Sequence, residues 1–353
     1  MISRRKLILG SCFSAVAGSI PVGALATKTK VEWRCTLAVP KTLAIWGPGL
    51  ERFSQMVELL TGGQFKIQIF GAGELIPALG TFEAVMNGEV QAGSAAAYYW
   101  LGKVPAAAYF TSVPFGMPIN GLLAWLEHGG GQELYDQLMH PYGVTCMPCG
   151  ATGFQMAGWF KNEINTIEDL KGLKIRIPGI AGRVLSQVGA VPVLMPGGEI
   201  FTSLSTGVID AVEWVGPYHD YLLGLHRAAK YYYGPGWQEP GPALELMINL
   251  KAWQELPKQY QLAIKIAAAE TTRWMLGAFE SKNSEYLVKF KSMESVQLKK
   301  LSPTILDRLR GVSKDVMSDL ANSAPIATKI HRSYTSFQKN LESFWTLSGD
   351  LAK

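Results

Sequence analysis

Charged residues and cysteines are scarce in this sequence. Only 17% of its 353 residues are charged, while 48% are hydrophobic, and an average soluble domain carries about 25% charged residues. This balance excludes an intrinsically disordered chain, and the length allows one large or two medium domains. The four cysteines do not form a disulfide scaffold, because a chain this long buries enough apolar surface without cross-links.

Residues 104–126 contain no charge at all, yet they do not have the pattern of a membrane-spanning helix. Pro105, Pro114 and Pro118 would break such a helix, and so would Gly116 and Gly121. The freed backbone groups could not be satisfied in lipid. We therefore expect this segment to be a buried part of a soluble protein.

The motifs of common enzyme classes are missing. H-E-x-x-H and G-x-S-x-G do not occur, and the nearest phosphate loop, at Gly102-Lys103, lacks its first glycine and its closing serine or threonine. A dinucleotide fingerprint beginning at Gly71 would need a glycine where Ile76 stands. The five histidines are scattered and none has metal-ligand spacing to another.

One C-x-x-C pair, Cys146 and Cys149, has the spacing of a redox motif. A redox pair normally opens a helix directly after a strand, where the helix dipole lowers the thiol pKa. Here the surrounding residues 143–150 have the pattern of a strand and a turn. We expect two half-buried strand cysteines, and the sequence leaves open whether they pair.

The N-terminus has the features of an export signal. Basic residues 4–6 precede an apolar run without acidic residues, and Ala24-Leu25-Ala26 supplies a small-residue cleavage site. Residues 1–26 are therefore predicted to be a signal peptide that sends the chain to the periplasm. The two arginines suit the twin-arginine route and the general route equally. Cleavage would reduce the formal net charge from +5 to +2, so basicity gives no reason to expect nucleic acid or anionic membrane as a partner.

Strand and helix patterns alternate through the first part of the mature chain. Leu50, Phe53, Val57 and Leu60 fall on one face at helical spacing, between strand patterns at residues 31–39 and 65–70. A helix at 81–87 and a strand at 90–97 follow. A β-α-β opening of this kind predicts a parallel sheet and an α/β architecture.

A similar series recurs and predicts a second α/β lobe. Glycine and proline accumulate near residues 148–152 and 233–242, which are plausible crossover segments or hinges. The predicted helices and strands of the second series are residues 166–171, 173–177, 182–188, 191–195, 199–205 and 209–214.

The C-terminal part has a helical pattern. After Pro257 neither proline nor glycine occurs until Gly277, inside a pattern that continues toward Phe290. Such a helix would be roughly 50 Å long, enough to run along both lobes. Further helices are predicted after Ser302 and near Pro325. The predicted divisions are lobe I at 27–150 plus about 240–280, lobe II at 151–239 plus part of the C-terminal region, and C-terminal helices at 281–353.

A few polar residues lie at strand ends and turns that are otherwise apolar. Arg176 ends a strand just before Pro178, and Glu213 ends another. A sheet covered by helices has no solvated face, so a guanidinium there suits recognition of a carboxylate in a crevice. Glu239 and Gln155 could supply more oxygens. Ordinary buried polar pairs are the alternative explanation.

At these residues the sequence resembles the substrate-binding subunits of TRAP transporters of the DctP type, and among them the branch that captures 2-oxo acids and related monocarboxylates. The resemblance covers nearly the whole mature chain. It is carried by residues 70–77, 96–100, 113–116, 153–156, 173–179, 196–201, 209–218 and 235–241.

The resemblance implies a two-lobed periplasmic binding protein fold, braced by a long helix, with a helical C-terminal tail. Arg176 matches the arginine that binds the substrate carboxylate. The resemblance also implies that His219 departs from the branch, in which asparagine is usual. Four residues match positions around a sodium or calcium ion and its substrate: Gln155, Glu213, Trp214 and Glu239. Three aromatic residues are expected pocket walls: Tyr98, Tyr99 and Phe115.

Two functions are compared. The first is a periplasmic receptor that binds a 2-oxo acid such as pyruvate, or a 2-hydroxy acid such as lactate, as a metal complex and delivers it unchanged to a membrane permease. The resemblance also permits a homodimer that exchanges C-terminal helices. The rival is an exported metal-assisted lyase or isomerase with Glu213 or Glu239 as general base. The site-bearing turns have no histidine, lysine or cysteine, which argues against the enzyme.

Overall fold

The computed structural model describes residues 30–348, which fold around two β-sheets. The first sheet has the strand order β2-β1-β3-β10-β4. In it β1 is parallel to β2 and β3, whereas β10 is antiparallel to β3 and β4. Its strands are β1 (Val31–Leu37), β2 (Phe65–Phe70), β3 (Ala92–Ala95), β4 (Val144–Ala151) and β10 (Ala243–Asn249). We call the part of the molecule around this sheet lobe I.

The second sheet has the order β11-β9-β5-β8-β6-β7, and we call the part around it lobe II. The predicted parallel arrangement holds for β6, β7 and β8, but β5 is antiparallel to both β8 and β9. Its strands are β5 (Gly158–Phe160), β6 (Lys174–Arg176), β7 (Val191–Val193), β8 (Ala211–Val212), β9 (Tyr231–Gly234) and β11 (Gln297–Lys300). Both sheets are therefore mixed, which corrects the prediction of a parallel sheet.

Helices cover the sheets where apolar spacing predicts them. In α1 (Trp46–Leu60) the side chains of Leu50, Phe53 and Val57 are buried, whereas Leu60 is exposed, contrary to the prediction. Leu60 lies in the last turn, beyond the part of the helix that packs on β2. The other short helices are α2 (Thr81–Met86), α5 (Gly179–Gln187), α6 (Ile200–Thr206), α7 (Pro217–Leu222) and α8 (Leu250–Glu255).

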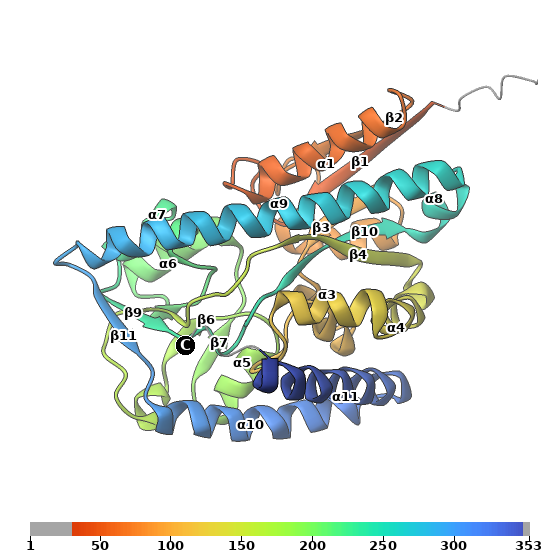
Figure 1. Ribbon diagram of the computed structural model, residues 1–353. Helices are drawn as coiled ribbons and strands as arrows, with labels where there is room; N and C mark the ends of the chain where they lie inside the picture. The colour runs from red at the N-terminus through yellow and green to blue at the C-terminus, as the bar shows by residue number, and fades with distance from the viewer. Residues whose placement is uncertain (1–29, 349–353) are drawn as a thin grey trace, which may run out of the picture.

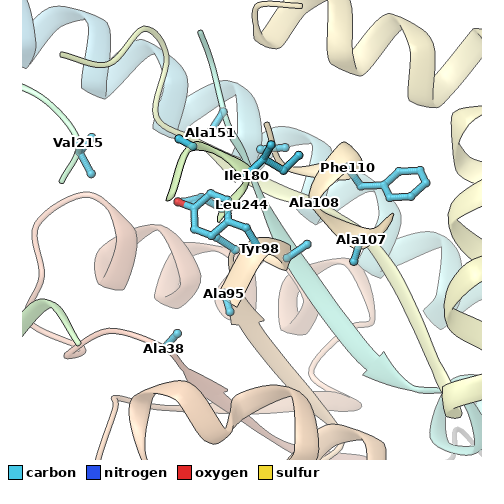
Figure 2. Packing of buried hydrophobic residues seen from close by; sticks show 14 of the residues in the cluster. Ala38, Ala95, Tyr98, Ala107, Ala108, Phe110, Ala151, Ile180, Val215 and Leu244 are labelled. Atoms are coloured by element: carbon cyan, nitrogen blue, oxygen red, sulfur yellow. The ribbon is translucent and has the colours of Figure 1, made fainter. Parts of the chain in front are cut away.

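The charge-free segment 104–126 is buried in lobe I, as predicted. It forms the 3-10 helix η3 (Pro105–Phe110) and most of α3 (Ile119–His128), which is followed by α4 (Gly131–Met139). Figure 2 shows Ala107, Ala108 and Phe110 of η3 in a core that also contains Tyr98 and Leu244. None of the helices within residues 30–348 is long and apolar enough to cross a membrane.

The long helix is present as predicted. The 34 residues of α9 (Lys258–Lys291) correspond to about 50 Å of helix. Figure 1 shows α9 running the length of the molecule, past α1 and β4 at one end and α7 at the other. It therefore lies against both lobes.

The tail consists of α10 (Pro303–Ala321) and α11 (Pro325–Ser348). The Ser302 hydroxyl accepts a hydrogen bond from the Ile305 N–H at 3.3 Å and caps α10, as its serine-proline start predicts. Figure 1 shows α11 alongside α10 and next to α3 and α4. The predicted signal peptide lies outside the described residues.

Two segments of chain lead from one sheet to the other besides α9. Residues 152–157 connect β4 with β5, and residues 235–242 connect β9 with β10. The sequence predicts the first crossover near Pro148, but β4 continues through Pro148 to Ala151 because it pairs with β10 along this length. Both crossover segments carry residues of the site described next.

Candidate functional site

Arg176 and Glu213 meet because their strands are parallel neighbours. The register pairs Arg176 of β6 with Val212 of β8, so Glu213 follows at the same edge of the sheet. The Arg176 Nη1 donates to the Glu213 carbonyl oxygen at 2.7 Å and lies 3.4 Å from the Glu213 carboxylate. Arg176 is 1% exposed and Glu213 is fully buried. Lys174, two residues earlier on β6, is exposed.

Trp214 lies against the guanidinium. The Arg176 Cζ is 4.9 Å from the centroid of the Trp214 ring, a distance at which a cation is attracted to the ring face. Gly197, in the 3-10 helix η6 (Gly197–Glu199), packs closely against the same indole, since a Cβ there would be 2.5 Å from the indole Cη2. Arg176 is thus held between a carboxylate and an aromatic ring.

The crossover segments bring Glu239 and Gln155 to the same site. The hydroxyl of Tyr98, from the 3-10 helix η2 (Ala97–Trp100) of lobe I, donates to the Glu239 carboxylate at 3.3 Å. The Gln155 amide donates to the Thr152 hydroxyl at 3.1 Å. Tyr99 interacts with Arg176, so residues of lobe I contact residues of lobe II here. The site therefore lies where the two lobes meet.

A hollow of about 320 Å³ opens outside Tyr98 and Tyr99. It is lined by both lobes, with Leu101 on one side and Pro178 and Leu194 on the other. The site residues are nearly inaccessible: Gln155, Trp214 and Glu239 are each at most 6% exposed. The structure is thus closed around the site.

Acidic groups outnumber the single guanidinium. Burial raises the pKa of Glu213 well above its usual range, and the charge of Glu239 adds to the rise while Arg176 opposes it. Burial likewise raises the pKa of Glu239 to about 7, against the lowering effect of Arg176 and of hydrogen bonds with Tyr98 and Gln155. Two buried carboxylates next to a single guanidinium favour the binding of an additional positive charge.

The donor atoms suit a hard cation. Glu213 Oε1, Gln155 Oε1 and Gln238 Oε1 are buried without a hydrogen-bond partner among the described residues. Unsatisfied buried oxygens are costly, and carboxylate and amide oxygens are the ligands that sodium- and calcium-type ions take. Within residues 30–348 no cluster of three His, Cys, Asp or Glu side chains is arranged to hold a metal.

Two polar residues at this site were not predicted. Gln238 is 1% exposed, and its amide donates to the Met156 carbonyl at 2.8 Å. Asp220 is also 1% exposed, and burial raises its pKa to about 7. The sequence signal for Gln238 is its position beside Glu239. Asp220 lies seven residues after Glu213, and only the fold brings its carboxylate close to Val215.

Phe115 lies at the edge of the site. The centroid of its ring lies 5.5 Å from that of Trp237, the neighbour of Gln238, and the Arg310 Cζ of α10 lies 4.2 Å from the Phe115 centroid. Its backbone N–H donates to the Trp237 carbonyl at 2.7 Å. Phe115 is therefore joined to the site through Trp237, whereas Tyr98 and Tyr99 contact the charged groups themselves.

The C-x-x-C pair lies on β4, a strand as predicted. Both thiols are free and fully buried rather than half-buried, because β4 is an edge strand covered by α4 and α9. Burial raises the pKa of Cys146 and of Cys149 well above the usual range. A redox-active cysteine needs the opposite shift and access to solvent, so this pair is structural.

The family model of DctP, described as bacterial extracellular solute-binding protein, family 7, matches residues 38–323. A monocarboxylate 2-oxoacid-binding periplasmic protein of Nostoc sp. is 40% identical over 346 residues, covering 96% of this chain and 94% of that protein.

Solved structures are similar along almost the whole chain. A TRAP solute-binding protein from Pseudoalteromonas atlantica with bound sodium and pyruvate is 36% identical, with a TM-score of 0.88 over 91% of this chain and 97% of that one. One from Colwellia psychrerythraea with calcium and pyruvate is 36% identical, with a TM-score of 0.88 over 91% and 98%. One from Bordetella bronchiseptica, a dimer with calcium and picolinate, is 33% identical, with a TM-score of 0.89 over 91% and 95%.

Proposed function

Because the chain belongs to the DctP family of bacterial extracellular solute-binding proteins and is a TRAP transporter substrate-binding protein, we propose that it captures a small monocarboxylate together with a cation. The acid is a 2-oxo acid such as pyruvate or a 2-hydroxy acid such as lactate, and the cation is sodium or calcium. Relatives that bind pyruvate with either ion support this choice.

The observation that carries the proposal is the position of Arg176. Its guanidinium is 1% exposed and faces the Glu213 carboxylate, whose Oε1 has no hydrogen-bond partner among the described residues. A substrate carboxylate bound to Arg176 would add a negative charge beside Glu213 and Glu239. A cation offsets this repulsion, because it attracts all three carboxylates at short range in a site from which water is excluded.

Each side chain then has a distinct role. Arg176 binds the substrate carboxylate, and Trp214 holds the guanidinium plane. Glu213, Gln155, Glu239 and the Trp214 carbonyl are the proposed oxygen ligands of the cation. The bound cation supplies positive charge and orients the acid. Tyr98 and Tyr99 form the wall toward lobe I, and Phe115 supports it from outside through Trp237.

Binding requires the lobes to separate and close again. A site whose charged groups are at most 6% exposed admits no ligand in the closed state, so the acid enters an open form. Closure over the ligand is the conformational difference that a membrane permease can recognise. We propose delivery to TRAP permease subunits from the periplasm, after export directed by residues 1–26 through the general or the twin-arginine route. The predicted lobe boundaries and a homodimer formed through the C-terminal helices are further proposals.

We also propose that the protein returns its ligand chemically unchanged. The site residues that contact one another include no histidine, lysine or cysteine, and Arg176 and the cation would stabilise a ground-state carboxylate. Incubating the protein with pyruvate or lactate and calcium, and following the acid by NMR, separates a receptor from a lyase or isomerase. Conversion of the acid at a rate proportional to protein concentration would support the enzyme.

Isothermal titration calorimetry tests the binding proposal. Pyruvate, longer 2-oxo acids and lactate are titrated with calcium or sodium present and after chelator treatment. Arg176→Ala is expected to weaken binding by about 2–5 kcal/mol, as for loss of a buried charged partner. Lys174→Ala, which removes an exposed cation from the same strand, is the matched control and should bind normally. Binding to a folded Arg176→Ala variant as tight as wild type, or no binding of any of these acids to wild type, contradicts the proposal.

A further inference from the structure

Asp220 receives hydrogen bonds from three parts of lobe II. Its carboxylate accepts from the Trp159 indole of β5 at 3.1 Å, from the Tyr232 hydroxyl of β9 at 2.8 Å and from the Val215 N–H at 3.4 Å. All three partners are donors. A carboxylate, which accepts at both oxygens, satisfies them, whereas an amide would turn an NH₂ group toward at least one donor.

These donors are held rigidly. The rings of Trp159 and Tyr232 stack with centroids 4.2 Å apart, and Phe290 of α9 packs edge-on against both at 5.1 and 5.5 Å. Neither ring can follow a displaced carboxylate without losing this packing. Asp220 is therefore fixed relative to the sheet, and Val215 is fixed relative to Asp220.

A run of hydrogen bonds continues from Val215 beneath the site. The Val215 carbonyl accepts from the Met156 N–H at 3.2 Å, and the Met156 carbonyl accepts from the Gln238 amide at 2.8 Å. Val215 follows Trp214, Met156 follows Gln155, and Gln238 precedes Glu239. The bonded residues thus adjoin the proposed oxygen ligands on three separate segments.

A buried carboxylate is costly for folding, and a protein with a well-packed apolar side chain in its place is often as stable or more so. Asp220 also raises the pKa of Glu213 through its charge. Its presence is therefore hard to explain by stability alone. It is explained by the geometry that it imposes on residues 213–215, through its hydrogen bond with the Val215 N–H.

We propose that Asp220 is a positioning residue for the cation half of the site, acting through the Val215 backbone to hold Glu213 and Trp214 in place. This inference rests on the proposed function. Asp220 touches neither the proposed acid nor the proposed cation, since its carboxylate is occupied by the three donors. Arg176 contacts both Glu213 and Trp214, but its own strand β6 and the Met195 carbonyl hold it as well.

The test is a set of pyruvate titrations at a series of calcium concentrations, with wild type and Asp220→Asn. The variant is expected to need at least tenfold more calcium for half-maximal pyruvate affinity. Its pyruvate affinity at saturating calcium should stay within threefold of wild type, because the bound calcium then holds Glu213 and Trp214, which contact Arg176, in place. Tyr232→Phe keeps the stacked ring and removes one of the donors to Asp220, so it should raise the calcium requirement about threefold. This variant replaces Asp220→Asn in the test if Asp220→Asn fails to fold.

Two comparisons separate positioning from general structural damage. Because Asp220 and Tyr232 are hydrogen-bond partners, the double variant Asp220→Asn with Tyr232→Phe should shift the calcium requirement by less than the product of the two single shifts. Tyr334→Phe on α11 removes a buried hydroxyl that accepts a hydrogen bond from the Met117 N–H. This variant is the remote control and should leave the calcium requirement unchanged.

An unchanged calcium requirement in Asp220→Asn, or equal losses of calcium and pyruvate affinity, would overturn the inference while leaving the proposed function intact. A wild-type protein whose pyruvate binding ignores calcium and sodium would instead refute the proposed cation site, and the role of Asp220 with it.

Discussion

The imidazole Nε2 of His219, on α7 in lobe II, lies 2.6 Å from the carbonyl oxygen of Ala44, in the loop before α1 in lobe I. A carbonyl oxygen can only accept, so Nε2 carries the hydrogen. The ring is fully buried and packs edge-on against Phe279 of α9 at 4.8 Å. This hydrogen bond therefore joins the two lobes in the closed state.

His219→Phe should weaken acid binding while leaving the fold intact. Phenylalanine keeps the edge contact with Phe279 but cannot donate to Ala44, whose carbonyl still accepts from the Trp46 N–H at 2.7 Å. Loss of one such hydrogen bond costs about 0.5–1.5 kcal/mol, which corresponds to roughly 2- to 13-fold weaker binding if the bond breaks on opening. His219→Gln, which keeps a donor of similar reach, is the control, and calorimetry is the measurement. Equal affinity of the Phe variant and wild type would show that the bond persists in the open form.

The stability of the protein should depend on pH through His219. Burial lowers the pKa of His219 to about 4 from the ordinary 6.5. Between these values the unfolded state takes up a proton that the folded state does not. The contribution of neutral His219 is therefore complete above pH 6.5 and is lost as the pH falls toward 4, by up to about 1.4 kcal/mol per unit.

Urea unfolding of wild type and His219→Gln at pH 7 and pH 5 isolates this effect. The wild-type free energy of unfolding should fall by about 2 kcal/mol relative to the variant between the two pH values. Asp220, whose pKa is raised to about 7, changes stability in the opposite sense, but it is present in both proteins and cancels. A difference between the two proteins that is independent of pH would refute the assignment to His219.

Glu239→Gln should stabilise the ligand-free protein and impair binding. The pKa of Glu239 is raised to about 7 from 4.5 by burial, so its ionised form is unfavourable in the folded state above pH 7. Removing that charge should raise the free energy of unfolding at pH 8 by about 1–3 kcal/mol, and the gain should shrink as the pH falls toward 4.5. The glutamine oxygen can still accept from Tyr98.

Thermal unfolding at pH 8, in chelator and then with calcium and pyruvate, is the measurement. The variant should melt higher than wild type in chelator and gain less from the ligands, because the cation loses a charged oxygen ligand. A lower melting temperature in chelator would show that Glu239 is already neutralised in the ligand-free site.

Gly197→Ala should weaken binding through Trp214. The new Cβ would lie 2.5 Å from the indole ring, and the ring cannot retreat without changing its contact with Arg176. We expect at least about tenfold weaker acid binding, equivalent to about 1.4 kcal/mol. Gly198→Ala is the matched control, since a Cβ there meets no heavy atom within 4 Å. Equal affinities of the two alanine variants would contradict a role for the Trp214 ring.

Local patterns in the sequence predict much of the secondary structure. The β1-α1-β2 opening, the length of α9 and the start of α10 at Ser302 follow from apolar spacing and cap chemistry, which involve residues close in the chain. The strands of lobe II are less well predicted. The pattern predicts a strand over 209–214, but β8 ends at Val212. The Glu213 carbonyl accepts from the Arg176 side chain, and Val215 bonds to Met156 and Asp220 instead of to a neighbouring strand.

The sequence by itself determined which chemistry is available: an arginine and a glutamate at strand ends, a second glutamate and a glutamine in glycine-rich crossovers, and no catalytic motif. Only the tertiary structure decided that these groups share one buried site. Arg176 and Glu213 are 37 residues apart and meet because β6 and β8 pair in parallel. The roles of Gln238 and Asp220, the full burial of the cysteines and the antiparallel β10 also depend on contacts between distant segments. Such contacts depend on packing and strand pairing between distant segments, and local sequence periodicity does not predict them.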